Sequence, residues 1–122
     1  MDKKYAAQEA ITHSMMGSLG LKLIEEKEGF IRASMPVNDN TSQPFGVLCG
    51  GASLAFAEII AGYGSYLCCP EGFIPVGSSV SGNHVSSVRK APDVWVYAEA
   101  TALHLGRTTH LWNVDILSLI HI

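Results

Sequence analysis

The chain contains few charged residues and has no excess of positive charge. Asp, Glu, Lys and Arg make up 16% of its 122 residues, below the ~25% that is usual for soluble domains. Hydrophobic residues make up 48%, which is more apolar surface than a small monomer can bury, so we expect an oligomer. The formal net charge of -3 excludes an overall basic field that would attract nucleic acid or an anionic membrane. Any anionic ligand must therefore be held by local groups.

Cysteines are also scarce, and the N-terminus lacks the apolar core and cleavage site of a secretory leader. We therefore expect a cytoplasmic protein. Cys49, Cys68 and Cys69 form an odd set without the CxxC spacing of zinc and redox sites, which predicts neither a metal site nor a disulfide framework. The stretch from Val47 to Leu67 is long enough to span a membrane, but it contains Glu58 and four glycines, which favours a buried helix.

A chain of this length is expected to form a single domain, residues 1–122. Apolar residues near helical spacing predict a short helix over residues 6–18. A second helix, apolar on nearly every face and so surrounded by protein, is predicted from about Gly50 to Leu67. Strands are predicted at Leu21–Glu26, Phe30–Val37, Ile74–Val88, Val94–Leu105 and Arg107–Leu117. This order predicts an α+β domain with an antiparallel sheet wrapped around one buried helix.

The last six residues, 117–122, match the translation of a transposon end that is widely used in making sequencing libraries. We therefore expect them to be foreign, and the native chain to have been cut near Ile116 before its final strand. The alternative is an ordinary apolar strand. No function is assigned to His121 in either case.

Glu58 is the only residue with a full charge between Pro44 and Pro70, and its neighbours are apolar. An isolated carboxylate in such surroundings is costly unless it is paired, hydrated or protonated, so a chain does not place one there for stability. The pattern indicates a functional residue. The alternative is that Glu58 faces water on a partly exposed helix, although no other polar residue marks a wet face.

Gly50 and Gly51 begin the same helix, where unpaired backbone N–H groups and the helix dipole favour a developing negative charge. This suggests an oxyanion hole, the alternative being a glycine pair that allows close packing. Gly50 and Glu58 lie eight positions apart, which is ~12 Å along a helix and too far for both to reach one carbonyl carbon. Two antiparallel helices from two subunits would bring Glu58 of one to Gly50 of the other, forming two equivalent sites.

Several short motifs occur in a fixed order between about Gly20 and Ile116. They are Gln43-Pro44-Phe45-Gly46, Cys49-Gly50-Gly51-Ala52-Ser53, Ala57-Glu58, Asn83-His84-Val85 and Leu103-His104-Leu105-Gly106-Arg107. Each motif is weak alone, but together they resemble the hotdog thioesterases of the phenylacetyl-CoA, 4-hydroxybenzoyl-CoA and 1,4-dihydroxy-2-naphthoyl-CoA group. The resemblance implies a hotdog fold and a homodimer or homotetramer with sites at the subunit interface. It also leaves a role in menaquinone biosynthesis open.

The same resemblance implies hydrolysis of an aromatic or related acyl-CoA to the free acid and coenzyme A. Glu58 would be the nucleophile or general base, the Gly50 amide would polarise the thioester, and Gln43 would lie near the acyl carbonyl. No cofactor is implied, because coenzyme A is part of the substrate. The expected substrate-binding residues are Cys49, Gly51, Phe45, His84, Ser86, Gly106 and Arg107. The candidate donors to the coenzyme A phosphates are His84, Ser86, Arg89, Lys90 and the Gly106-Arg107 turn. His104 and His110 are expected to be packing or surface histidines.

The chain departs from the group at two positions. Cys49 replaces the histidine that usually precedes the glycine pair, and Gly62 replaces a serine or threonine that is common one turn after the glutamate. These changes leave open a non-catalytic acyl-CoA or metabolite-binding module. A thiol mechanism with Cys49 at the helix N-terminus is a second alternative, but no histidine base can be assigned beside it from the sequence. The pairing of catalytic residues found in hotdog dehydratases is not evident.

Overall fold

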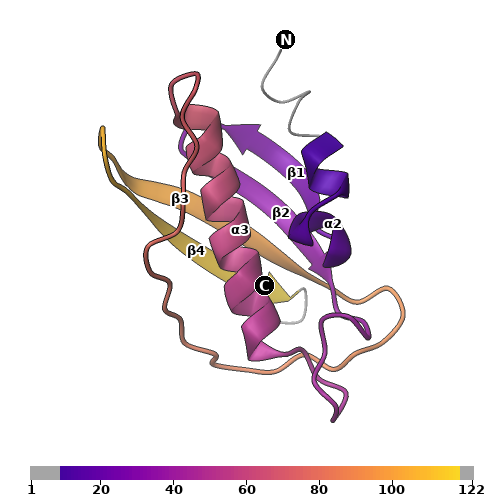
Figure 1. Ribbon diagram of the computed structural model, residues 1–122. Helices are drawn as coiled ribbons and strands as arrows, with labels where there is room; N and C mark the ends of the chain where they lie inside the picture. Colours follow the sequence, from indigo (N-terminus) through magenta and orange to yellow (C-terminus); the bar gives the residue numbers. More distant parts are fainter. Residues whose placement is uncertain (1–8, 119–122) are drawn as a thin grey trace.

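The computed structural model describes residues 9–118, which form a four-stranded antiparallel sheet with one long helix across it (Figure 1). The strands follow the chain in the order β1-β2-β3-β4, and every neighbouring pair is antiparallel. The elements are α2 (Met15–Ser18), β1 (Lys22–Lys27), β2 (Phe30–Pro36), α3 (Gly50–Cys68), β3 (Trp95–Leu105) and β4 (His110–Ser118). Residues 9–12 are also helical.

The core lies between α3 and the inner face of the sheet. Alternate residues of the two central strands are fully buried there, because side chains on a strand point to opposite faces. Phe56 and Ile60 of α3 have no exposed surface and fill the space between the helix and these strand residues. Burying each such large side chain contributes roughly 1.5–3 kcal/mol. The buried strand residues are Ile31, Ala33, Met35, Val96, Ala98 and Ala100, of which the alanines allow the helix to lie close to the sheet.

Most predicted elements are confirmed within a few residues, including the central helix and four of the five strands. The predicted lead helix is interrupted at His13 and Ser14, and its residues 6–8 lie outside the described residues. No helix of residues 9–118 is long and apolar enough to cross a membrane. Leu117 and Ser118 continue β4, whereas residues 119–122 lie outside the described residues. The foreign origin of residues 117–122 therefore stays a prediction.

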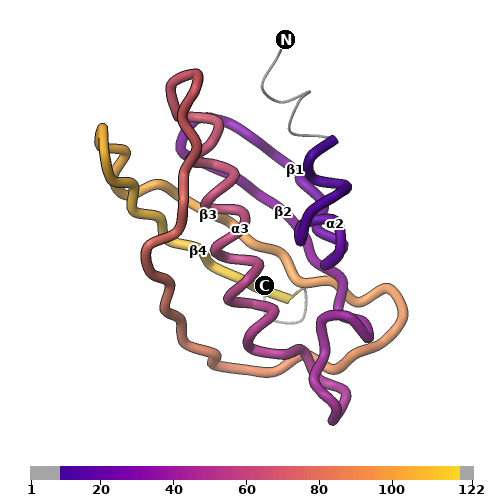
Figure 2. Tube along the Cα trace, viewed as in Figure 1, coloured from indigo at the N-terminus to yellow at the C-terminus, as the bar shows by residue number. Residues whose placement is uncertain are grey.

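The predicted strand at Ile74–Val88 is wrong. These residues belong to no helix or strand and run as an extended segment beside α3, back toward its first turn (Figures 1 and 2). The segment is fixed at its end, where Leu48 N–H donates to the Val88 carbonyl over 2.8 Å and Val47 forms a bridge with Arg89. A strand needs a neighbour that exchanges backbone hydrogen bonds with it, and residues 9–118 place none along this segment.

The prediction that α3 is surrounded by protein is also wrong for the single chain. Six of its nineteen residues are buried, and these include Phe56, Ile60, Tyr63 and Gly64 on the side that faces the sheet. Gly51 and Glu58 are exposed. A sequence that is apolar on every face cannot show which face the chain itself covers, and here one side of the helix is left open.

Gly64→Ala should destabilise the fold. A β-carbon at residue 64 would lie 2.6 Å from Cη2 of Trp112 and 3.1 Å from Cγ1 of Ile31. Such overpacking of a filled core typically costs about 1–3 kcal/mol, which urea unfolding followed by circular dichroism would measure. Gly62→Ala is the matched control, because no atom lies within 4 Å of its added carbon and alanine favours the helix by up to ~1 kcal/mol. Equal stability of the two variants would contradict this packing.

Candidate active site

The first turn of α3 presents backbone donors that have no backbone acceptor within residues 9–118. Cys49 is the N-cap residue, with extended backbone (φ -74°, ψ 130°) and no side-chain cap hydrogen bond. Its carbonyl accepts from the N–H groups of Ala52 and Ser53 at 3.0 and 3.3 Å, while the N–H groups of Gly50 and Gly51 bond to no described residue. Together with the helix dipole, these two N–H groups can stabilise an anionic oxygen.

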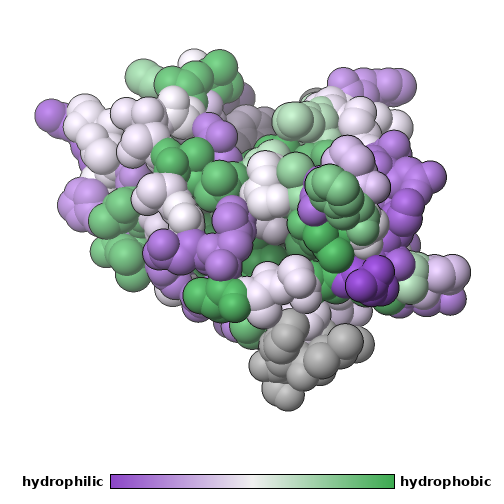
Figure 3. Space-filling model, turned by 90° about the horizontal axis from the view of Figure 1, so that it is seen from below, coloured by the Kyte–Doolittle hydropathy of each residue, from purple (hydrophilic) through white to green (hydrophobic). Residues whose placement is uncertain are grey.

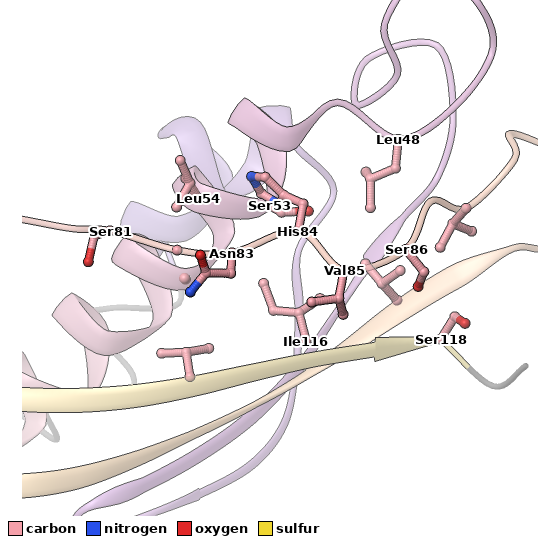
Figure 4. Close-up of a pocket in the computed structure, with 15 residues that line it drawn as sticks. Leu48, Ser53, Leu54, Ser81, Asn83, His84, Val85, Ser86, Ile116 and Ser118 are labelled. Carbon is pink, nitrogen blue, oxygen red and sulfur yellow. The ribbon is translucent and has the colours of Figure 1, made fainter. Parts of the chain in front are cut away.

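His84 lies directly against this helix end. A β-carbon added at Gly50 would be 2.8 Å from Nε2 of His84 and 3.1 Å from its Cδ2, so only glycine leaves room for the imidazole. Figure 4 shows His84 beside Ser53 and the first turn of α3. The sequence grouped His84 with the residues that would hold the coenzyme A phosphates, whereas the structure places its ring against Gly50, the first residue of α3.

Three close approaches align the extended segment antiparallel to α3, each at a glycine. His84 lies against Gly50, the side chain of Leu54 lies 2.9 Å from the β-carbon position of Gly82, and the carboxylate of Glu58 lies against Gly77. Residues later in the helix thus contact residues earlier in the segment. Glycine at these positions therefore allows the segment to approach the helix closely.

Glu58 is exposed in the single chain. The expectation that apolar groups enclose this carboxylate is therefore wrong for the single chain. The alternative, that Glu58 faces water on a partly exposed helix, holds instead. An added β-carbon at Gly77 would collide with Oε1 of Glu58, so residue 77 limits where this carboxylate can lie. Because Gly50 and Glu58 both lie in α3, the ~12 Å helical rise between them holds. One chain does not bring them together.

A cavity of about 180 Å³ opens between the first half of α3, the extended segment, the start of β3 and the second half of β4 (Figure 4). Val96, Val114 and Ile116 contribute apolar surface, while Ser53 and His84 contribute polar groups. Ser53 is only 9% exposed, and no hydrogen bond of its hydroxyl occurs within residues 9–118. The cavity is smaller than the ~300 Å³ at which small-molecule sites usually begin. Ser86, an expected substrate-binding residue, also lines it.

Gln43 and Phe45 lie in the turn that precedes the helix. The side-chain oxygen of Gln43 accepts a hydrogen bond from the Phe45 N–H, and the Gln43 N–H donates to the Val47 carbonyl at 2.9 Å. Phe45 is 84% exposed. In the single chain, the Gln43 oxygen therefore stabilises its own turn, and the expected contact of Gln43 with an acyl carbonyl stays a prediction.

The remaining expected ligands of coenzyme A are scattered. Gly106 and Arg107 lie in the β3–β4 hairpin, near the C-terminal end of α3 and away from Gly50 (Figure 1). Lys90 pairs with Asp39 at 2.8 Å, and this contact lowers the pKa of the Asp39 carboxyl through its hydrogen bond and charge. His110 approaches the buried Ser65 hydroxyl at 2.8 Å, as the packing interpretation expects.

Comparison with known proteins agrees with the sequence resemblance. Residues 45–119 match the Thioesterase superfamily profile. A putative esterase from Haemophilus influenzae is 41% identical over 86% of this chain and 74% of its own length. The 1,4-dihydroxy-2-naphthoyl-CoA hydrolase of Escherichia coli is 36% identical over 84% of this chain and 74% of its own length.

The three-dimensional structure gives the same result. A crystal structure of a thioesterase from Haemophilus influenzae superposes with a TM-score of 0.87 and 35% identity, covering 100% of this chain and 83% of that one. A second, of a mutant thioesterase from Pseudomonas aeruginosa, superposes with a TM-score of 0.86 and 34% identity over 98% of this chain and 85% of that one. The chain therefore belongs to the thioesterase superfamily and is a thioester hydrolase with the hotdog fold.

Proposed function

We propose that the protein hydrolyses an acyl-CoA thioester to the free acid and coenzyme A, in active sites shared between two subunits. The observation that carries this proposal is the arrangement of Gly50 and Glu58 on α3. The helix presents unpaired N–H groups at its first turn and an exposed carboxylate two turns later. A second, antiparallel copy of α3 would bring one carboxylate to each helix start.

The chemistry of such a site needs two contributions. The N–H groups of Gly50 and Gly51 would bind the thioester oxygen and stabilise the negative charge that develops on it. Glu58 of the other subunit would attack the carbonyl carbon or take a proton from water. The exposure of Glu58 in the single chain supports access of water and substrate to its carboxylate. The reaction consumes water only, so no cofactor is needed.

Exposed apolar residues of the extended segment, and Phe73 just before it, support a second subunit. Phe73, Ile74, Val76 and Val85 are 67%, 76%, 84% and 93% exposed, and their backbone takes part in no strand. Apolar groups also reach the surface between polar ones on the face seen from below in Figure 3. Burial of such a patch in a homodimer would remove apolar surface from water. A homotetramer of two such dimers remains part of the proposal.

The acyl group we propose is aromatic or a related group. The Escherichia coli relative is named as a hydrolase of 1,4-dihydroxy-2-naphthoyl-CoA, which supports naphthoyl and benzoyl thioesters as first substrates and keeps menaquinone biosynthesis open. The cavity of about 180 Å³ favours the smaller members, unless a second subunit extends it. Cytoplasmic location stays an expectation from the sequence.

A non-catalytic acyl-CoA-binding module is the second candidate. Gly62 lies one turn after Glu58, with no atom within 4 Å of its β-carbon position, so the single chain supplies no hydroxyl there to hold water. Such a module would bind acyl-CoA without steady release of thiol. Colorimetric detection of free thiol, over a panel of aromatic, naphthoyl and straight-chain acyl-CoAs, separates the two functions.

Glu58→Gln should lower turnover by ~100-fold or more, because the amide keeps the size of the side chain but cannot act as base or nucleophile. Steady-state thiol release measures this loss, and calorimetric titration with coenzyme A should still show saturation. Glu71→Gln, at an exposed position after α3, is the matched control. Cys49→Ala should retain activity. Loss of turnover in Cys49→Ala, with Glu58→Gln near wild type, would require a thiol mechanism instead.

Mixing two inactive variants tests the shared site. Gly50→Pro removes one N–H at the first helical position, where proline is tolerated, and the extended backbone of Cys49 suits a residue before proline. Alone, this variant and Glu58→Gln should each be nearly inactive. Randomly mixed subunits should regain about one quarter of wild-type activity, because half of the dimers are hybrids with one intact site.

Two controls make the mixing experiment specific. Gly50→Ala also displaces His84 but keeps the N–H, so any greater loss in Gly50→Pro measures the contribution of that donor. Size-exclusion chromatography with light scattering establishes that each variant still assembles. Absence of regained activity in confirmed hybrid dimers would show that each site lies within one subunit.

A further inference from the structure

We propose that His84 is an additional catalytic residue, which donates the proton from Nε2 to the coenzyme A sulfur as the thioester breaks. This inference rests on the proposed function, because it needs the thioester carbonyl at Gly50. It assigns His84 to the reacting atoms, in place of the phosphate contact that the sequence suggested. Nothing in the motif itself indicates such a role.

The position of the ring is the first argument. Nε2 is the ring atom of His84 nearest to the β-carbon position of Gly50, at 2.8 Å, with Cδ2 and Cε1 at 3.1 and 3.3 Å. In the proposed function the thioester oxygen is bound by the Gly50 N–H, so the carbonyl carbon and the sulfur bonded to it would lie at the helix start that the ring borders. The imidazole therefore borders the space in which the C–S bond must break.

The surroundings of the ring are the second argument. Ser53 lies at the start of α3 and lines the same cavity as His84, and its hydroxyl makes no hydrogen bond within the described residues. This hydroxyl is therefore available to a polar ligand in the cavity beside His84. The ring itself is exposed, so solvent can restore its proton after each turnover.

The proton balance of the step closes with water alone. Water adds to the carbonyl carbon while Glu58 of the other subunit takes its proton. The C–S bond then breaks, its electron pair goes to sulfur, and the Nε2 proton of His84 goes to the same sulfur to give the free thiol. Glu58 releases its proton to solvent, and His84 takes one from solvent. The net change is thioester plus water giving carboxylic acid plus thiol.

The leaving group provides the test. We would compare three thioesters of one acyl group, formed with coenzyme A, with N-acetylcysteamine and with 4-nitrothiophenol. The first two release an alkyl thiolate, which benefits from a proton donor, whereas the aryl thiolate is stable enough to leave without one. N-Acetylcysteamine lacks phosphates, so it separates proton donation from any contact with the nucleotide part of coenzyme A.

His84→Gln should lower kcat for both alkyl thioesters by ~100-fold, the lower end of what general acid catalysis contributes, and leave the aryl thioester close to wild type. His84→Ala should behave in the same way. His13→Gln, at an exposed histidine before α2, controls for loss of a histidine elsewhere. Circular dichroism melts establish that the variants are folded.

Three other results would overturn the role. Equal losses on all three thioesters would make His84 a structural group or a carbonyl donor. A loss confined to the coenzyme A ester would make it a ligand of the nucleotide, as the sequence suggested, and no loss at all would leave it without a catalytic role. If wild type releases no thiol from any acyl-CoA, or if Glu58→Gln is fully active, the proposed function itself fails and this role with it.

Discussion

The packing of α3 against the sheet is the contact on which the rest of the structure depends. Phe56 and Ile60 are fully buried against the alanine-rich inner faces of β2 and β3. Because a helix repeats every 3.6 residues, burying this side fixes the opposite side, where Gly51 and Glu58 are exposed. One hydrophobic contact therefore sets both the stability of the domain and the direction in which the candidate catalytic carboxylate points.

Glycines determine how closely the return segment can follow this helix. His84 occupies the space above Gly50, Leu54 the space at Gly82, and Glu58 the space at Gly77. Residues separated by 19 to 34 positions in the chain are thereby placed beside one another, and both proposed reactive side chains contact a glycine. These contacts give the Glu58 and His84 side chains defined positions, although within residues 9–118 no hydrogen bond joins the segment to the helix at the three glycines. It also explains why glycine occurs at functional positions that need no unusual backbone angle.

In the proposed mechanism, the single chain holds half of each active site. The N–H donors and the His84 imidazole lie at the start of α3, whereas the Glu58 carboxylate of the same chain lies two turns further along this helix. A helix cannot bend to close that gap without losing backbone hydrogen bonds, so in the proposed mechanism a second copy of the helix supplies the carboxylate. The low charge content, the exposed apolar segment and the divided site are thus three consequences of the same proposed assembly.

The sequence by itself determined the α+β class, the central helix, four of the strands and the thioesterase family. The class, the helix and the strands follow from local periodicity and turn residues, which act over a few neighbouring residues. The family follows from a resemblance carried by several motifs in a fixed order along the chain. Only the tertiary structure decided that Ile74–Val88 is not a strand, that Glu58 is exposed in the single chain, and that His84 lies at Gly50. The reason is that pairing, exposure and contact depend on what lies across from a residue in space. For His84 and Gly50 that neighbour is more than thirty positions away, beyond the reach of any local pattern.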